Sequence, residues 1–281
     1  MSYLTPRSME AAFAALGTAG ATVVAGGTDW YPALGERLPS GDVLDITALP
    51  GLRGITTGAG VIRIGAATPW SDLIAADLPP AFDGLKAAGR EVGSVQIQNA
   101  GTIGGNLCNA SPAADGVPPL LTLGARVELG SASGCRDLAL ADFILGPRRT
   151  ALRPGELLAA VLIPQPGHGA RGAFLKAGAR RYMVISIASA AAVLRLDQGR
   201  IVAAMVAVGS CSAVPQRLVA LEAALVGCAA SALPAITPEH LASLSPIADV
   251  RGSAAYRLRL VGVLVARVLQ AAAGPGPADH G

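Results

Sequence analysis

Two glycine-rich stretches contain the residue types and spacing that could support chemistry. The first, Gly26-Gly27-Thr28-Asp29, follows a short β-branched run, and the second, Gly101-Thr102-Ile103-Gly104-Gly105-Asn106, lies in a longer stretch rich in Gly and Asn. Consecutive glycines allow backbone N–H groups to converge on phosphate oxygens, because no Cβ atom obstructs the approach. Either stretch alone is more often an ordinary turn. Two of them, neither with a lysine nearby, favour a pyrophosphate held by backbone dipoles and hydroxyls, and therefore a dinucleotide.

Other phosphate-binding and catalytic patterns are absent from the sequence. Neither G-x-G-x-x-G after the first predicted strand nor G-x-x-x-x-G-K-[ST] occurs, so a Rossmann enzyme and a P-loop kinase are disfavoured. The four cysteines form no C-x-x-C pair, which argues against an iron–sulfur cluster or a zinc site held by this chain alone. The three histidines lie away from both stretches and no G-x-S-x-G turn is present, so hydrolytic and nucleophilic catalysis lack support.

Asp115 is a candidate polar ligand beyond the second stretch. It follows Asn106 by nine residues and could accept hydrogen bonds from a ribose or hold the loop in place. It could equally be the N-cap of a helix that starts near Val117, and spacing alone does not separate these two interpretations.

The pattern of apolar residues in the first half predicts mixed α and β structure. Thr5-Pro6 predicts the start of a helix that ends near Gly17, and residues 21–25 form a predicted strand that leads into the first glycine pair. Further short strands are expected at residues 43–46, 54–57 and 61–64. The stretch 92–124 carries few charges and is expected to be a ligand-facing loop.

A junction rich in Pro and Gly at residues 164–169 predicts a domain boundary. Beyond it, strands are expected at residues 170–176, 185–196 and 201–208, with the last two forming an antiparallel hairpin. Helical segments at 216–225, 238–244 and 253–272 follow, and the apolar stripe of the last one predicts a sheet with helices on one face.

Composition excludes several classes of protein. With 52% hydrophobic and 15% charged residues, the 281-residue chain can bury the cores of two domains and is not a candidate for disorder. Its net charge of +3 is spread along the chain, which disfavours a nucleic-acid-binding face. No apolar stretch reaches the roughly 20 residues of a spanning helix, and no signal-like segment opens the chain. We therefore expect a cytoplasmic protein without membrane insertion.

Both glycine stretches resemble the FAD-binding segments of the molybdenum hydroxylase flavoprotein family. The matching stretches read AGGTDWYP and TIGGNLCNASPAADGVPPLLTLGA, and further similarity lies at DITALPGLRGI, FLKAGARRYMVISIA and DVRGSAAYR. The family comprises the FAD-binding medium subunits of xanthine, carbon monoxide and aromatic-heterocycle dehydrogenases, and the resemblance covers almost the whole chain. The acidic residue that many relatives carry after the arginines is replaced in Arg180-Arg181-Tyr182-Met183, so these residues receive no role.

The resemblance implies which residues hold the cofactor. One wall of the FAD site would be Val23, Val24, Ala25, Gly26, Gly27, Thr28, Asp29 and Trp30, and the other would be Thr102, Ile103, Gly104, Gly105 and Asn106. Asp115 would hold the sugar or adenylate side, Leu158 would contact the flavin, and Lys176 would lie near the ring. A cation there would stabilise the anionic reduced ring and raise its potential. Without the resemblance, Lys176 would be taken for a surface lysine at a strand edge. No catalytic residue and no metal ligand is expected.

The resemblance also implies an α+β fold with two domains. A two-lobed FAD-binding domain of the PCMH/vanillyl-alcohol-oxidase type is expected over residues 1–167. A smaller antiparallel sheet-plus-helices domain, like the C-terminal domain of the CO dehydrogenase flavoprotein, is expected over residues 170–273.

The implied function is electron transfer within a heterotrimer, which is expected to dimerise. Electrons would pass from a large molybdopterin-binding subunit, through two [2Fe–2S] clusters of a small subunit, to FAD on this chain and then to NAD+ or another acceptor. Two alternatives are a stand-alone flavin oxidoreductase of the same fold and a flavin-free assembly or scaffold subunit. The first is disfavoured because no candidate base lies beside the glycine stretches, and the second because both stretches are intact.

Overall fold

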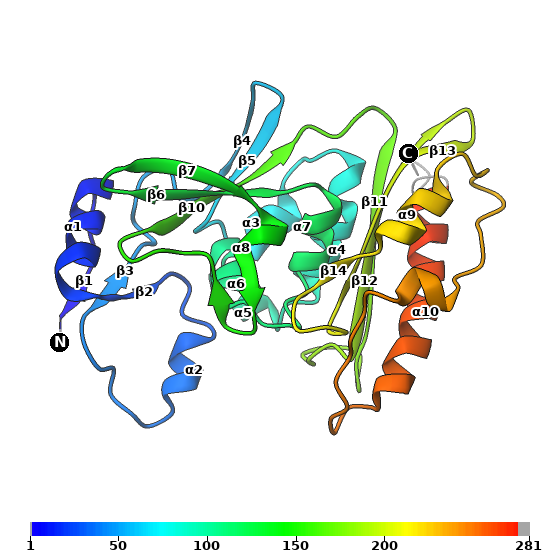
Figure 1. Ribbon diagram of the computed structural model, residues 1–281. Coiled ribbons are helices and arrows are strands. Elements are labelled where there is room, and N and C mark those ends of the chain that lie inside the picture. Colours follow the sequence, from blue (N-terminus) through cyan, green and yellow to red (C-terminus); the bar gives the residue numbers. More distant parts are fainter. Residues whose placement is uncertain (1, 275–281) are drawn as a thin grey trace. The chain divides into compact units, whose positions relative to one another are not determined.

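The computed structural model describes residues 2–274, which form two compact units. Unit 1 comprises the residues up to 76 together with 89–111 and 124–165. Unit 2 comprises 77–88, 112–123 and the residues from 166 onward. Two inner segments of the first half of the chain therefore belong to the second unit (Figure 1).

Unit 1 contains a small parallel sheet and a larger antiparallel one. In the small sheet, β1 (Tyr3–Leu4) and β2 (Thr22–Val24) pair in parallel with the central β3 (Val43–Asp45). The five-stranded sheet has the order β4-β5-β10-β6-β7, formed by Ile55–Gly58, Val61–Gly65, Leu157–Pro164, Arg126–Ser131 and Gly134–Ala139. A short hairpin joins β8 (Ile144–Gly146) to β9 (Arg149–Thr150).

The helices of unit 1 are short. They are α1 (Met9–Ala19), α2 (Trp30–Leu34), α3 (Trp70–Ala75), α5 (Val95–Ala100), α6 (Ile103–Asn109) and α8 (Leu140–Phe143). Ala12 of α1 packs with Leu44 and Ile46 in a core that covers the small sheet. This packing fixes the end of β2, from which the first glycine stretch leaves.

Two helix boundaries differ from those expected. The first helix begins at Met9, because the Ser8 hydroxyl, not that of Thr5, accepts the N–H of Ala11 at 3.2 Å. The expectation of a loop over residues 92–124 is wrong, since this stretch contains α5, α6 and, in unit 2, α7 (Val117–Thr122). Ser94 and Thr102 act as N-caps there, and capping hydroxyls favour helix initiation even where glycines follow.

Unit 2 is built on a four-stranded antiparallel sheet in sequence order. Its strands are β11 (Ala170–Ala177), β12 (Ala188–Asp197), β13 (Arg200–Gly209) and β14 (Gln216–Arg217). The predicted hairpin between β12 and β13 is confirmed. Outside the sheet lie η1 (Pro80–Phe82), α4 (Asp83–Arg90), α9 (Val219–Leu225), η2 (Pro238–Leu241) and α10 (Ala254–Ala273). The last two residues of α4 belong to unit 1.

The expectation of helices on one face of this sheet is wrong. Ala188, Ala190 and Ala192 of β12 pack in one core with α9 and α10, whereas α7 contacts β12 and β13 on the other side of the sheet (Figure 1). The helix η1 contacts β11. The approach of η1 requires a glycine: a Cβ atom at Gly172 would lie 2.1 Å from the carbonyl oxygen of Ala81. The residues that cover this second face come from the first half of the chain.

Candidate functional site

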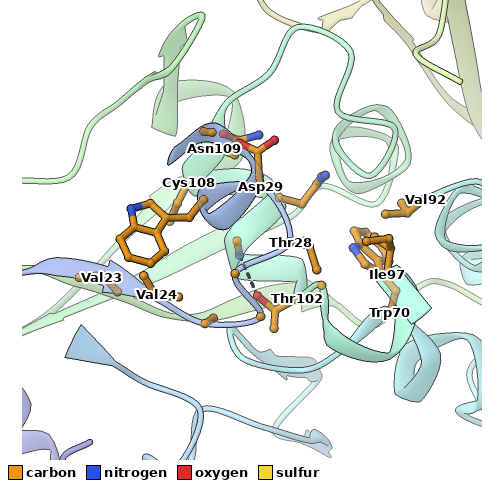
Figure 2. Close-up of a pocket in the computed structure, with 18 of the residues that line it drawn as sticks. Val23, Val24, Thr28, Asp29, Trp70, Val92, Ile97, Thr102, Cys108 and Asn109 are labelled. Atoms are coloured by element: carbon orange, nitrogen blue, oxygen red, sulfur yellow. Dashed lines mark hydrogen bonds between the residues drawn. The ribbon is translucent and has the colours of Figure 1, made fainter. Parts of the chain in front are cut away.

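A pocket of about 510 Å³ lies in unit 1 where the first glycine stretch faces α6. Figure 2 shows Val23 and Val24 on one side of this pocket and Val92, Ile97 and Trp70 on the other, with Asp29 and Asn109 between them. Eleven of the predicted residues line it: Val23, Val24, Ala25, Gly26, Gly27, Thr28, Asp29, Trp30, Thr102, Gly105 and Asn106. The lining also includes Gly101, which begins the second glycine stretch, and residues that the sequence did not single out: Ala33, Trp70, Val92, Ile97, Cys108, Asn109 and Arg148.

The first glycine stretch lines the pocket, and its backbone donors are unused. Among the described residues, none of the N–H groups of residues 26–29 has a hydrogen-bond acceptor. Gly27 has φ +66°, a left-handed conformation that glycine adopts without steric cost. At Gly26 a Cβ atom would lie only 1.7 Å from the carbonyl oxygen of Ala100, so the stretch runs directly against the end of α5. Four consecutive unpaired donors in a pocket are suited to the oxygens of an anion.

In the second glycine stretch, unlike the first, the backbone N–H groups of residues 103–106 are already hydrogen-bonded within the protein. They donate to Thr68 O, Ala66 O, Thr102 Oγ1 and Thr102 O, respectively. The expectation that this stretch forms a second nest of free N–H groups is therefore wrong. A Cβ atom at Gly104 would lie 2.6 Å from Ala66 O, so Gly104 allows α6 to pack against the chain beyond β5. Only side chains and the outer face of α6 remain available to a ligand here.

Asn106 provides a polar group without a partner. Its Oδ1 atom is buried and accepts no hydrogen bond from any described residue, although Asn106 lines the pocket. A buried acceptor left in this state costs about 1–3 kcal/mol. A ligand hydroxyl or N–H group that enters the pocket would satisfy it. Nearby, burial raises the pKa of the Cys108 thiol to about 12, so this cysteine is protonated at neutral pH and is no nucleophile.

Thr102 connects the start of α6 to the pocket wall. Its Oγ1 accepts the N–H of Gly105 at 3.0 Å (Figure 2). We expect Thr102→Val to lower the free energy of unfolding by about 1 kcal/mol, because the N-cap acceptor is lost. Urea unfolding measures this loss, and Thr102→Ser, which keeps the hydroxyl, is the control. Equal stability of the Val and Ser variants would contradict the capping role.

Arg148 joins three segments at the rim of the pocket. It lies in the turn between β8 and β9, and its Nη1 donates to Asp29 Oδ2 at 2.7 Å and to Asn109 Oδ1. Its backbone N–H donates to the carbonyl oxygen of Ala110, which ends α6. Arg148 is 119 residues from Asp29, so no local spacing in the sequence could have indicated this contact.

Three of the predicted residues in unit 1 do not line the pocket. Ile103 is 1% exposed inside α6, and Gly104 packs against Ala66 as described. Leu158 is buried in β10, beside the irregularity in its pairing with β6. Each of the three supports the structure around the pocket from within the core.

Asp115 and Lys176 form a buried ion pair in unit 2. Lys176 Nζ lies 2.8 Å from Asp115 Oδ2, and their side chains are 6% and 9% exposed. Lys176 also donates to Val184 O at 3.1 Å, and the Ser186 hydroxyl donates to Asp115 Oδ1 at 2.5 Å. Burial raises the pKa of Asp115, while Lys176 and Ser186 act in the opposite direction. Helix α7 has Gly116 as its N-cap with no side-chain cap, so the N-cap interpretation of Asp115 is wrong. The surface-lysine interpretation of Lys176 is also wrong, because the side chain of Lys176 is buried.

Residues 2–274 contain no helix that is both long enough and apolar enough to cross a membrane. The same range contains no group of three or more His, Cys, Asp or Glu side chains placed to hold a metal ion.

Comparison with known proteins identifies the family. Residues 1–166 match the family model described as the FAD binding domain in molybdopterin dehydrogenase. The chain belongs to this family of FAD-binding medium subunits of molybdenum hydroxylases. Residues 173–272 match a second family model, the CO dehydrogenase flavoprotein C-terminal domain. The resemblance stated from the two glycine stretches, the α+β fold and the oxidoreductase class are thereby confirmed.

Relatives of the medium-subunit family match along nearly the full chain. The carbon monoxide dehydrogenase medium chain of Afipia carboxidovorans is 33% identical, with 96% of each chain covered. A xanthine dehydrogenase FAD-binding subunit of Escherichia coli O157:H7 is 33% identical over 90% of this chain and 88% of its own length. The crystal structure of quinoline 2-oxidoreductase from Pseudomonas putida 86 superposes with a TM-score of 0.85 at 28% identity, covering 97% of this chain and 96% of that one.

Proposed function

We propose that this medium subunit binds FAD in the pocket of unit 1 and transfers electrons between partner subunits and a terminal acceptor. The observation that carries the proposal is the set of four consecutive unpaired N–H groups at residues 26–29. Such a set matches the diphosphate of a dinucleotide, whose oxygens accept several hydrogen bonds at once. The pocket of about 510 Å³ is large enough for part of such a cofactor.

The remaining lining fits the other parts of FAD. Asn106 Oδ1 requires a donor, and the ribityl and ribose hydroxyls of FAD are donors. Trp70, Ile97 and Val92 provide an apolar end for a ring. When bound, FAD supplies transfer of one or two electrons. The residues of this chain bind it, orient it and exclude water from it, which requires no general acid or base.

The roles that the resemblance gives to residues outside the pocket remain proposals. Asp115 would hold the sugar or adenylate side, Leu158 would contact the flavin, and Lys176 would lie near the ring. The ion pair with Asp115 opposes the positive charge of Lys176. Any effect of Lys176 on the flavin potential would therefore be smaller than that of an unpaired cation. The division into domains at residues 1–167 and 170–273 is also a proposal, supported by the separate matches of the two family models.

The partners and the location are inferred from the family. We infer a large molybdopterin-binding subunit and a small subunit with [2Fe–2S] clusters in a cytoplasmic heterotrimer, with NAD+ or another compound as the acceptor. Support comes from relatives named as medium chains or FAD-binding subunits of dehydrogenases. Those relatives are named for carbon monoxide, xanthine and quinoline at 28–33% identity.

The first test is the visible absorption spectrum of the purified full-length chain. Flavin bands whose chromophore, released by heat, co-migrates with FAD are expected. A colourless chain that cannot be reconstituted with FAD would refute the proposal and favour a scaffold subunit. Co-purification with molybdenum and iron would separate the medium subunit from a stand-alone flavin oxidoreductase.

Asn106→Leu tests whether the buried, unpaired Oδ1 atom of Asn106 binds the cofactor. We expect FAD affinity to fall by about tenfold, because a hydroxyl of the cofactor would lose a buried partner worth on the order of 1.4 kcal/mol. Fluorescence titration with FAD measures the change. Asn99→Leu is the matched control, since Asn99 is exposed on α5 and does not line the pocket. Equal affinities of the two variants would exclude a direct contact of Asn106 with the cofactor.

A further inference from the structure

The charged residues that line the pocket are one acid and one base. Asp29 and Arg148 carry opposite charges, and every other lining residue is neutral. The pocket is therefore electrically neutral as a whole. A diphosphate carries about two negative charges near neutral pH, and the N–H groups of residues 26–29 offer dipoles but no net charge.

The contacts of Arg148 leave part of its guanidinium available. Nη1 donates to Asp29 and Asn109, while Nε and Nη2 have no hydrogen-bond partner among the described residues. The fixed planar fork of an arginine can therefore bind a carboxylate with one edge and a phosphate oxygen with another. The contact to Asn109 and the backbone bond to Ala110 O hold this fork at the rim of the pocket.

Stability alone does not explain this arrangement. The side chains of Arg148 and Asp29 are 62% and 56% exposed, and exposed ion pairs contribute little to folding. Arg148 also has φ +58°, a left-handed conformation that is unfavourable for a residue with a Cβ atom. A strained residue whose ion pair is exposed at the rim of a binding pocket suggests a role in binding.

We propose that Arg148 is a cofactor-binding residue that compensates the charge of Asp29 and provides the positive charge for the diphosphate. Without Arg148, the carboxylate of Asp29 would lie beside the incoming dianion with no cation among the lining residues to offset it. The inference rests on the proposed binding of FAD in this pocket and adds a residue from the β8–β9 turn to it.

The test is titration of the full-length apoprotein with FAD for four variants. Arg148→Gln is expected to weaken FAD binding by about 10- to 100-fold, since a charge-assisted contact to phosphate is lost and Asp29 is left unpaired. Arg149→Gln is the matched control: it removes the same charge from the neighbouring residue, at the start of β9, and Arg149 does not line the pocket. Its affinity is expected to stay within about twofold of the wild type.

Asp29→Asn separates charge compensation from simple bracing of the loop. If Arg148 acts by charge, Asp29→Asn alone raises FAD affinity, because it removes a negative charge beside the diphosphate, and the double variant Arg148→Gln/Asp29→Asn recovers part of the loss. The affinity of the wild type is also expected to fall more steeply with salt than that of Arg148→Gln. If Asp29→Asn weakens binding as much as Arg148→Gln and the double variant shows no recovery, the arginine only braces the loop and the inference is wrong.

The outcomes also distinguish the inference from the proposed function. A wild-type chain that binds no FAD would refute the proposed function itself. A wild-type chain that binds FAD, with Arg148→Gln and Arg149→Gln both at wild-type affinity, would refute only the role of Arg148.

Discussion

Gly26→Ala is expected to abolish FAD binding to the full-length chain. The added Cβ atom would lie 1.7 Å from Ala100 O and 2.4 Å from Ala100 C, both of which are backbone atoms that cannot rotate away. The first glycine stretch or the end of α5 must shift, and the N–H groups of residues 26–29 would shift with it. Loss of two or more charge-assisted hydrogen bonds corresponds to an affinity loss of more than about 100-fold. Fluorescence titration with FAD is the measurement.

Gly58→Ala is the control for Gly26→Ala. Gly58 ends β4, its φ is not in the left-handed region, and no atom lies within 4 Å of the position of an added Cβ. This variant should bind FAD as the wild type does. Overpacking at Gly26 should also lower the free energy of unfolding by about 1–3 kcal/mol. A Gly26→Ala chain with wild-type FAD affinity would show that the diphosphate is not held by this stretch.

Lys176→Met is expected to lower the free energy of unfolding by about 3–5 kcal/mol at neutral pH, because the buried carboxylate of Asp115 loses its cation. Urea unfolding followed by far-UV circular dichroism measures the loss. The double variant Lys176→Met/Asp115→Asn removes both charges, keeps an acceptor for Ser186, and should regain most of the stability. If the double variant is as unstable as Lys176→Met, packing of the lysine stem rather than charge is responsible.

The pH dependence of Lys176→Met follows from the pKa of Asp115. Burial already raises this pKa, and Lys176 is one of the groups that lower it. Without Lys176 the folded-state pKa rises further above the value in the unfolded chain, about 3.9. Asp115 then binds a proton more tightly in the folded variant than in the unfolded chain. The stability that this proton contributes is fully present below the unfolded pKa of Asp115 and is lost as the pH rises through the folded pKa. The loss in free energy of unfolding caused by Lys176→Met should therefore become smaller as the pH is lowered.

The first glycine stretch could be predicted from the sequence because its signal is local. A β-branched run that ends in two glycines specifies a strand followed by a tight turn, and the structure has β2 followed by residues with unpaired N–H groups. The antiparallel hairpin of β12 and β13 was predictable for the same reason, since a Gly-containing turn separates two apolar runs.

The second stretch was misinterpreted although a signal was present. Thr102 is followed by a helix, and a hydroxyl residue before such a run is an N-cap signature. With that helix recognised, Gly105, Cys108 and Asn109 follow at spacings of three and four and share one face. All three line the pocket. Glycine content, which suggested a loop, instead reflects the close packing of Gly104 against Ala66.

Two of the side-chain contacts have no local signal at all. Arg148 reaches Asp29 across 119 residues, and Ser186 reaches Asp115 across 71. Such contacts depend on how the strands and turns pack, which periodicity within one segment does not encode. The burial of Lys176 was missed for the same reason, because a lysine in a strand is normally exposed unless a partner from elsewhere neutralises it.

The interleaved composition of unit 2 constrains the order in which the protein can fold on the ribosome. Residues 77–88 and 112–123 are synthesised early, but the sheet that they cover is encoded only from residue 170 onward. Phe82, Leu85 and Leu120 are fully buried in the folded protein. Their side chains cannot be buried in this way until the strands of that sheet have been synthesised. At about 5–20 residues per second the delay is on the order of ten seconds. During that interval the nascent chain exposes apolar segments that a chaperone could bind.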